Sequence, residues 1–249
     1  MIVLYSKEFY SEEIYKDVMK LWKNFKHDIK HSNRFFVGEE IVKLLDEINM
    51  SSKNFKSDYN IMSGYTIENT LFYRARIGNF IHSSNKEMLS PPMNKATSGR
   101  CNPMGISYLY LTNNVETAIN EVKPTKGDII TIAEVNVKKD RIFSFNILKY
   151  FNEKKSDEYL KSKKLEVLID IINDDLSSII KSNKDIDYLP FQFLAEYIKK
   201  RGYNGFSYKS VMCDNGENFV FFNNDGVEII KKSIYKINKV KYAYEKIST

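Results

Sequence analysis

The sequence has few of the residues that crosslink or interrupt a chain. Its 249 residues include only two cysteines, five prolines and ten glycines. Cys101 and Cys213 lie far apart and form no CxxC pair, so the sequence offers neither a disulfide framework nor a cysteine-based zinc site. Two isolated cysteines are typical of a reducing compartment, and we expect a cytoplasmic protein.

Long apolar runs are also missing. No stretch approaches the ~20 apolar residues that span a bilayer, and the segment MIVLYSKEFYSEEIYK (1–16) lacks the basic start and apolar run of a signal peptide. We therefore expect no membrane association. The 17 tyrosines and 16 phenylalanines can fill a sizeable core. The length fits one large domain, or one domain with a smaller helical part.

Motifs of the common metal and nucleotide sites are absent as well. His27, His31 and His82 are the only histidines. The first two are spaced for one helix face, but no HExxH glutamate accompanies them, so we expect solvated side chains and no metal. The sequence contains no GxGxxG, GxxxxGK[ST] or GxSxG, which argues against a Rossmann fold, a P-loop and a nucleophile elbow.

The chain is basic, with a formal net charge of +6. Such an excess of positive charge can bind nucleic acid or another anionic ligand. The lysines occur singly or in pairs along the whole chain rather than as a basic block, which favours a compositional origin of the charge. Nucleic acid is therefore not the partner that the sequence favours.

Hydrophobic periodicity predicts two helices at the start of the chain. Apolar steps of three and four run through 8–30, and GEEIVKLLDEI predicts a second helix over 38–48. The polar stretch 51–60 is expected to be a loop. We therefore divide the chain into a helical N-terminal segment, 1–65, and a second domain, 66–249.

The second domain mixes strands with helices. Expected strands are 70–77, 107–111, 127–137, 205–210, 217–222 and 227–237. Expected helices are 114–122, which a capping box at Asn113 and Glu116 opens, 146–162, 164–181 and 189–205. Because helices interleave with strands and the chain ends in antiparallel hairpins, we predict an α+β fold.

Two arginines stand in apolar surroundings on the strand LFYRARI. Arg74 and Arg76 are two apart, so their side chains point to the same face of the strand. Buried cations need partners, and either an anionic ligand or a structural carboxylate can supply them. The residues alone leave both solutions open.

Two further side chains are candidates for chemistry. Glu121 falls on the edge of the apolar stripe of the 114–122 helix, which predicts a half-buried carboxylate that can point into a cleft, although a surface glutamate fits too. Ser210 ends the expected strand 205–210, where a serine is commonly a turn former.

The loop before the expected strand 107–111 is rich in proline and glycine. The stretch SGRCNPMGISYLY covers 98–110, and three of the five prolines and two of the ten glycines lie between 91 and 105. Arg100 sits among them. About thirty residues here show neither helical nor strand periodicity, which is typical of a functional loop.

Three stretches together resemble the RES family, named for Arg, Glu and Ser residues and found as toxins of bacterial toxin–antitoxin pairs. They are LFYRARIG (71–78), PPMNKATSGRCNPMGISYLYLTNNVETAINEV (91–122) and GYNGFSYKS…ENFVFF (202–222). The family pattern is an early arginine, a GR-x-N-P-x-G segment, a tyrosine-bearing strand, a helix ending T-A-x-x-E-V and a late Y-x-S. All parts occur in order, and the resemblance covers about 66–235.

The resemblance implies a fold similar to ADP-ribosyltransferase catalytic domains and an enzyme that cleaves the nicotinamide–ribose bond of NAD⁺ with water or phosphate as acceptor. NAD⁺ is then substrate, and no cofactor is implied. The implied catalytic residues are Glu121, Arg74 and Ser210, and the implied substrate-binding residues are Arg100, Tyr110 and Arg76. A cognate antitoxin is the implied protein partner, and the sequence leaves a homo-oligomer open.

Two departures and two alternatives accompany this interpretation. Cys101 replaces the aromatic residue that often follows GR, and the shorter toxins lack the first ~65 residues, whose KNFKHDIKHSNRFF stretch resembles a helical domain that accompanies RES in some bacterial proteins. The alternatives are a mono-ADP-ribosyltransferase with a protein acceptor and a non-enzymatic nucleic-acid-binding module. Arginines isolated in apolar strands and a Pro/Gly loop disfavour the second alternative.

Overall fold

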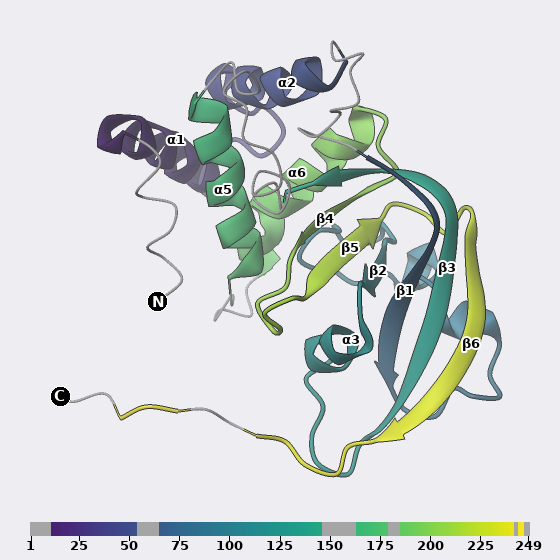
Figure 1. Ribbon diagram of the computed structural model, residues 1–249. Coiled ribbons are helices and arrows are strands. Elements are labelled where there is room, and N and C mark those ends of the chain that lie inside the picture. Colours follow the sequence, from purple (N-terminus) through teal and green to yellow (C-terminus); the bar gives the residue numbers. More distant parts are fainter. Residues whose placement is uncertain (1–10, 54–64, 146–162, 179–184, 242–243, 247–249) are drawn as a thin grey trace.

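The computed structural model describes residues 11–53, 65–145, 163–178, 185–241 and 244–246. Most helices gather beside one end of a strongly curved sheet, and one short helix lies against its other end (Figure 1). The chain therefore has an α+β fold preceded by a helical N-terminal segment, as the sequence predicts. No helix in these ranges is both long enough and apolar enough to cross a membrane.

The N-terminal segment consists of α1 (Glu12–His31) and α2 (Glu39–Lys53). Ser11 caps α1, and its hydroxyl accepts the amide of Ile14 at 3.4 Å. The predicted stripe is buried, with Val18, Trp22, Phe25 and Ile29 all in the core. Residues 51–53 continue α2, so the loop predicted from residue 51 is wrong at its start.

The strands are β1 (Tyr65–Ile77), β2 (Leu109–Thr112), β3 (Ile129–Ser144), β4 (Gly205–Lys209), β5 (Glu217–Phe221) and β6 (Val227–Lys236). Neighbours pair in the order β1–β2–β5–β4–β3, and β3 pairs back to β1, so these five strands close into a ring. β6 pairs with the first part of β3, Ile129–Val137, on the edge that β4 joins at Ile142–Ser144. Among the strand pairs of the described residues, only β3 and β4 run parallel.

Strands β1 and β3 are longer than the sequence pattern indicates. Their antiparallel ladder runs from Tyr65 opposite Ile142 to Ile77 opposite Ile130. It includes the polar pair Glu68 and Lys139, which the periodicity excluded from both strands. Backbone pairing with a neighbour holds such residues in a strand whatever their own preference.

The described residues contain three further α-helices, α3 (Val115–Glu121), α5 (Lys163–Ser177) and α6 (Leu189–Lys200), besides short 3-10 turns. Asn114 caps α3 by accepting the amide of Thr117 at 2.8 Å, so the capping box predicted at Asn113 is wrong by one residue. Asn113 instead ties α3 to β5, because its side chain accepts the amide of Glu217 at 3.0 Å. The helix predicted over 146–162 lies outside the described residues.

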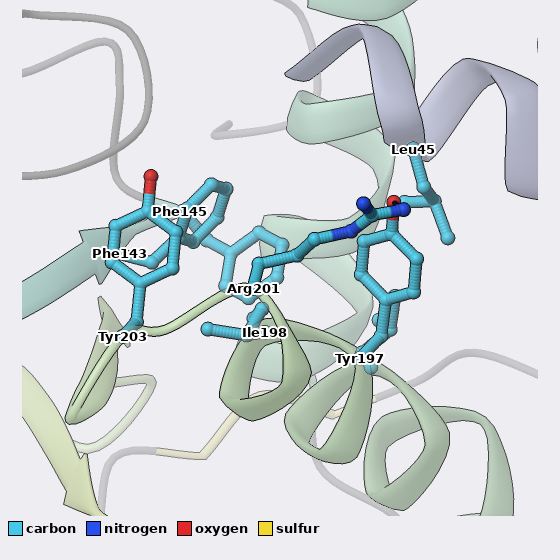
Figure 2. A pocket seen from close by; sticks show the side chains of 8 residues that line it. Leu45, Phe143, Phe145, Tyr197, Ile198, Arg201 and Tyr203 are labelled. Atoms are coloured by element: carbon cyan, nitrogen blue, oxygen red, sulfur yellow. Dashed lines mark hydrogen bonds between the residues drawn. The ribbon is translucent and has the colours of Figure 1, made fainter. Parts of the chain in front are cut away.

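Helix α2 is fixed against α6 and the end of β3. A small apolar hollow of about 20 Å³ remains between Leu45, Phe143 and the side chains of α6 (Figure 2). A space of that size holds about one water molecule, not a nucleotide. Beside it, Arg201 pairs with the carboxylate of Asp46 on α2, which also accepts the hydroxyl of Tyr197.

Candidate functional site

Glu121 is the last residue of α3, and one oxygen of its carboxylate is held in place. Oε1 accepts hydrogen bonds from Ser210 Oγ at 2.8 Å and from Asn218 Nδ2 at 2.7 Å. Within the described ranges no side chain or backbone group binds Oε2. The residue is exposed, not half-buried as its helix-edge position predicted, because α3 ends here. The carboxylate thus has a fixed direction and one oxygen to offer a ligand.

Ser210 follows β4 directly and is buried. Its hydroxyl donates to Glu121 and accepts the amide of Met212 at 3.1 Å. Its own amide donates to the carbonyl of Gly216 at 2.8 Å. A Cβ at Gly216 would lie only 2.9 Å from the Ser210 side chain, so a glycine is needed for this close turn. The serine therefore forms the turn and holds Glu121 at the same time.

Asn218 and Tyr208 extend this network across the sheet. They lie opposite each other on β5 and β4, so their side chains share one face, and the Asn218 amide also hydrogen-bonds the Tyr208 hydroxyl. Burial, with a contribution from the Glu121 carboxylate, raises the pKa of Tyr208 well above 10. Its phenol is therefore neutral at physiological pH. The sequence analysis missed Asn218, because an asparagine in ENFVFF carries no signal of its own.

Arg74 lies where β1 and β2 part. The two strands pair at Tyr73 and Thr112, and Arg74 Nη1 reaches across to the Tyr110 carbonyl at 3.4 Å. Within the described residues no carboxylate lies within 4 Å of this guanidinium. Burial, reinforced by the neighbouring charge of Arg76, lowers the pKa of Arg74 to about 10. The group stays charged at neutral pH and lacks a counter-ion.

Arg76 pairs with a structural carboxylate, which is one of the two kinds of partner that the sequence left open for these arginines. Its guanidinium donates to the Glu87 carbonyl and lies 3.6 Å from the Glu87 carboxylate. It also stands 4.8 Å from the centre of the Phe80 ring. Of the two arginines, only Arg74 is left with an unneutralised charge, which makes it the better candidate for an anionic ligand.

Tyr110 organises the GR-x-N-P-x-G loop through its hydroxyl. The hydroxyl donates to Asn102 Oδ1 at 2.8 Å and accepts the amide of Cys101 at 3.2 Å. Asn102 Nδ2 in turn donates to the carbonyls of Thr97 at 2.8 Å and Ile106 at 3.0 Å. The tyrosine predicted to face a substrate thus also fixes the loop that carries Arg100.

Arg100 reaches the C-terminal end of α5. Its Nη1 donates to the carbonyl of Leu176, and its Nη2 donates to the carbonyl of Ser178 at 3.0 Å. Carbonyls at a helix C-terminus carry partial negative charge and attract cations. They are neutral groups, however, so the guanidinium is oriented without being neutralised.

The predicted site residues therefore separate into one cluster and two outlying arginines. Glu121, Ser210 and Tyr110 lie on one face of the strands β2, β5 and β4. Tyr208 lies on the same face, and the charges of Arg100 and Glu121 both shift its pKa. Arg74 contacts this cluster through the backbone of Tyr110, while Arg76 is turned toward Glu87.

Two other candidates from the sequence belong to structural roles. Cys101 is fully buried, and burial raises its pKa to about 12, so its thiol is neutral and unreactive. The rings of His27 and His31 lie on an exposed face of α1 with their centres 5.2 Å apart and their planes tilted by 55°. In the described parts of the chain no three potential ligand side chains come together around a metal position.

The chain is similar to known proteins over most of its length. The model of the RES domain family matches residues 71–244. Among solved structures, a chain of the M. tuberculosis MbcT–MbcA toxin–antitoxin complex is similar, with 13% sequence identity, a TM-score of 0.47, and coverage of 78% of this chain and 92% of that chain. No curated protein matches.

Proposed function

The chain belongs to the RES family, and from this membership together with the site we propose that it cleaves the nicotinamide–ribose bond of NAD⁺. The observation that carries the proposal is the Glu121 carboxylate, anchored through Oε1 and open at Oε2. A carboxylate fixed in this way is suited to a reaction in which positive charge develops on a sugar ring.

In the proposed reaction the bond between ribose C1′ and the nicotinamide nitrogen breaks. The electron pair leaves with nicotinamide, which becomes a neutral molecule, and the ribose passes through an oxocarbenium-like state. Glu121 stabilises that cation, and its open oxygen accepts a ribose hydroxyl. Water or phosphate then forms the new bond at C1′ and gives up a proton to solvent. Because the leaving group is neutral, a strong general acid is not needed.

The substrate-binding roles fall to the arginines and the tyrosine. Arg74 carries a charge without a counter-ion and is assigned to the diphosphate, which a guanidinium can bind with two hydrogen bonds. Arg100 is assigned to the same group from the loop side. Arg76, which pairs with Glu87, is assigned no direct contact with the substrate. Tyr110 offers its ring face to the nicotinamide or ribose, and Ser210 keeps Glu121 in position.

The biological role proposed with this activity is that of a bacterial toxin or defence effector in the cytoplasm. Depletion of NAD⁺ harms the cell that contains the enzyme, so a cognate antitoxin protein is the expected partner. The biological role and the antitoxin partner are both inferred from the family resemblance.

The test is a product analysis with purified full-length protein and NAD⁺ labelled in the ADP-ribose part, with and without phosphate. Free nicotinamide with free ADP-ribose would identify a glycohydrolase, and a phosphate ester at ribose C1′ would identify a phosphorylase. Label on an added protein acceptor would overturn the proposal in favour of a mono-ADP-ribosyltransferase. NAD⁺ left intact under every condition would overturn enzymatic cleavage altogether.

A further inference from the structure

Arg100 is oriented by the last turn of α5, and that turn is fixed in its own right. Asp175 directly precedes Leu176, whose carbonyl accepts the Arg100 guanidinium. The Asp175 carboxylate is held by two side chains of α1, because Trp22 Nε1 and Lys26 Nζ both donate to Oδ2. We call these three side chains, Trp22, Lys26 and Asp175, the α5 brace.

The α5 brace has the burial expected of a fixed contact. Trp22 is fully buried, and the side chains of Lys26 and Asp175 are 28% and 31% exposed. The buried stripe of α1 packs into the same apolar cluster as Ile172 and Leu176. A partly desolvated, charge-assisted pair beside a packed core restricts a helix end far more than a solvated surface pair does.

We propose that helix α1 is a positioning element of the active site, which acts through the α5 brace on Arg100. α1 fixes Asp175, Asp175 fixes the carbonyls of Leu176 and Ser178, and these carbonyls set the direction of the guanidinium. This inference deepens the proposed function and rests on it. It gives the N-terminal segment a role within the site.

A second ion pair between α1 and α5 provides a matched control for the α5 brace. Lys164 lies at the opposite end of α5 and pairs with Asp17 of α1 at 3.8 Å, with both side chains more than half exposed. Lys26→Met and Lys164→Met therefore each remove one lysine between the same two helices. Only the first lies beside the carbonyls that hold Arg100.

The experiment measures steady-state NAD⁺ cleavage by full-length variants. We expect Lys26→Met to raise KM for NAD⁺ roughly tenfold with a much smaller change in kcat, because the diphosphate is remote from the bond that breaks. Trp22→Phe, which keeps the ring and removes the N–H donor, should act in the same direction. Lys26→Arg should restore KM, and Lys164→Met should leave it unchanged.

A double-mutant cycle separates positioning from a general loss of stability. If Lys26 acts through Arg100, Lys26→Met should add little to the KM of Arg100→Lys, whereas independent effects would multiply. Equal KM values for Lys26→Met and Lys164→Met, or full multiplication in the double variant, would overturn the inference while leaving the proposed function intact.

A second readout does not depend on catalysis. Amide hydrogen exchange of loop 98–106 should speed up in Lys26→Met and not in Lys164→Met, because only the first loosens the end of α5. If the wild type leaves NAD⁺ intact, the proposed function is wrong, but the difference in amide exchange between the two variants still tests whether the α5 brace orders loop 98–106. The same exchange in both variants would overturn it.

Discussion

Glu121 and Arg74 illustrate how a residue's surroundings decide its role. Glu121 is exposed, yet two hydrogen bonds fix one of its oxygens. Arg74 is largely enclosed, yet within the described residues it has a backbone carbonyl and no carboxylate as partner. An ordinary protein interior would neutralise that cation, as Glu87 does for Arg76. This uncompensated charge supports the proposed contact between Arg74 and an external anion.

A first prediction concerns the stability cost of that charge. The pKa of Arg74 lies below its ordinary value, so the folded state disfavours the cation. Arg74→Gln should therefore abolish NAD⁺ cleavage while raising the free energy of unfolding by about 1–3 kcal/mol. Arg76→Gln, which loses an ion pair, should not stabilise the fold. Urea denaturation of both variants checks this, and a strong loss of stability in Arg74→Gln would give Arg74 a structural role instead.

A second prediction concerns pH. Burial, with the nearby charge of Asp225, raises the pKa of Asp140 from 3.8 to about 6. The folded state therefore holds this proton where the unfolded chain has lost it, so stability should fall as the pH rises from about 4 to 6. At pH 7 the ionised group costs at most about 3 kcal/mol, or roughly 1.4 kcal/mol for each unit by which the pKa is raised.

Asp140→Asn removes that cost and should raise the melting temperature at pH 7 while leaving it unchanged near pH 4. Asp225→Asn should produce a smaller gain, because it removes only the charge repulsion and not the burial. Thermal melts between pH 4 and 7 provide the measurement. A melting temperature of Asp140→Asn that follows the wild type across the whole range would contradict the shifted pKa.

Among the structural elements, the GR-x-N-P-x-G loop is ordered by hydrogen bonds from α6 and within its own backbone. Gln192 of α6 donates to the carbonyls of Gly99 at 2.9 Å and Asn102 at 3.1 Å. The Gly99 amide donates back to the Asn102 carbonyl at 2.9 Å. Residues without regular secondary structure thus present Arg100 from a rigid frame.

A third prediction follows from the space at Gly99. A Cβ there would clash with Asn102 Oδ1 and come within 3.3 Å of the Tyr110 hydroxyl, so Gly99→Ala should displace Asn102 and loosen the loop. We expect kcat/KM for NAD⁺ to fall by roughly tenfold or more. Gly38→Ala is the control, because nothing lies within 4 Å of its added carbon. Unchanged kinetics in Gly99→Ala would show that the loop tolerates the displacement.

The sequence predicts the elements better than it predicts their ends. Local periodicity locates α1, α3, α6 and the late hairpins, because each has an apolar face of its own. It fails where a distant partner decides, as at Glu68 of β1 and Lys139 of β3, which belong to strands because they pair with each other. The cap of α3 was misplaced because Asn113 and Asn114 are equally good capping residues in sequence.

At the level of the whole molecule, the sequence singled out Glu121, Ser210 and Arg100 but not the contacts that each of them makes. It could not show that Asn218 and Ser210 share the Glu121 oxygen, or that Glu87 pairs with Arg76. Such contacts depend on tertiary pairing between segments without a common sequence signal. The roles of these residues in catalysis stay predictions.

The closed ring of strands and the flanking helices meet at the site. α3 supplies Glu121, the end of β4 supplies Ser210, and α5 holds Arg100. The N-terminal segment reaches this region through α1, whose Trp22 and Lys26 hold Asp175 of α5.

We propose that Glu121 of this chain promotes cleavage of the bond between nicotinamide and ribose. The most direct test compares nicotinamide release from NAD⁺ by the wild type, Glu121→Gln and Glu116→Gln, a substitution of the same kind earlier on α3. We expect release by the wild type, a loss of roughly 100-fold or more in Glu121→Gln, and no loss in Glu116→Gln. Equal rates of nicotinamide release by Glu121→Gln and the wild type would contradict a catalytic role of Glu121.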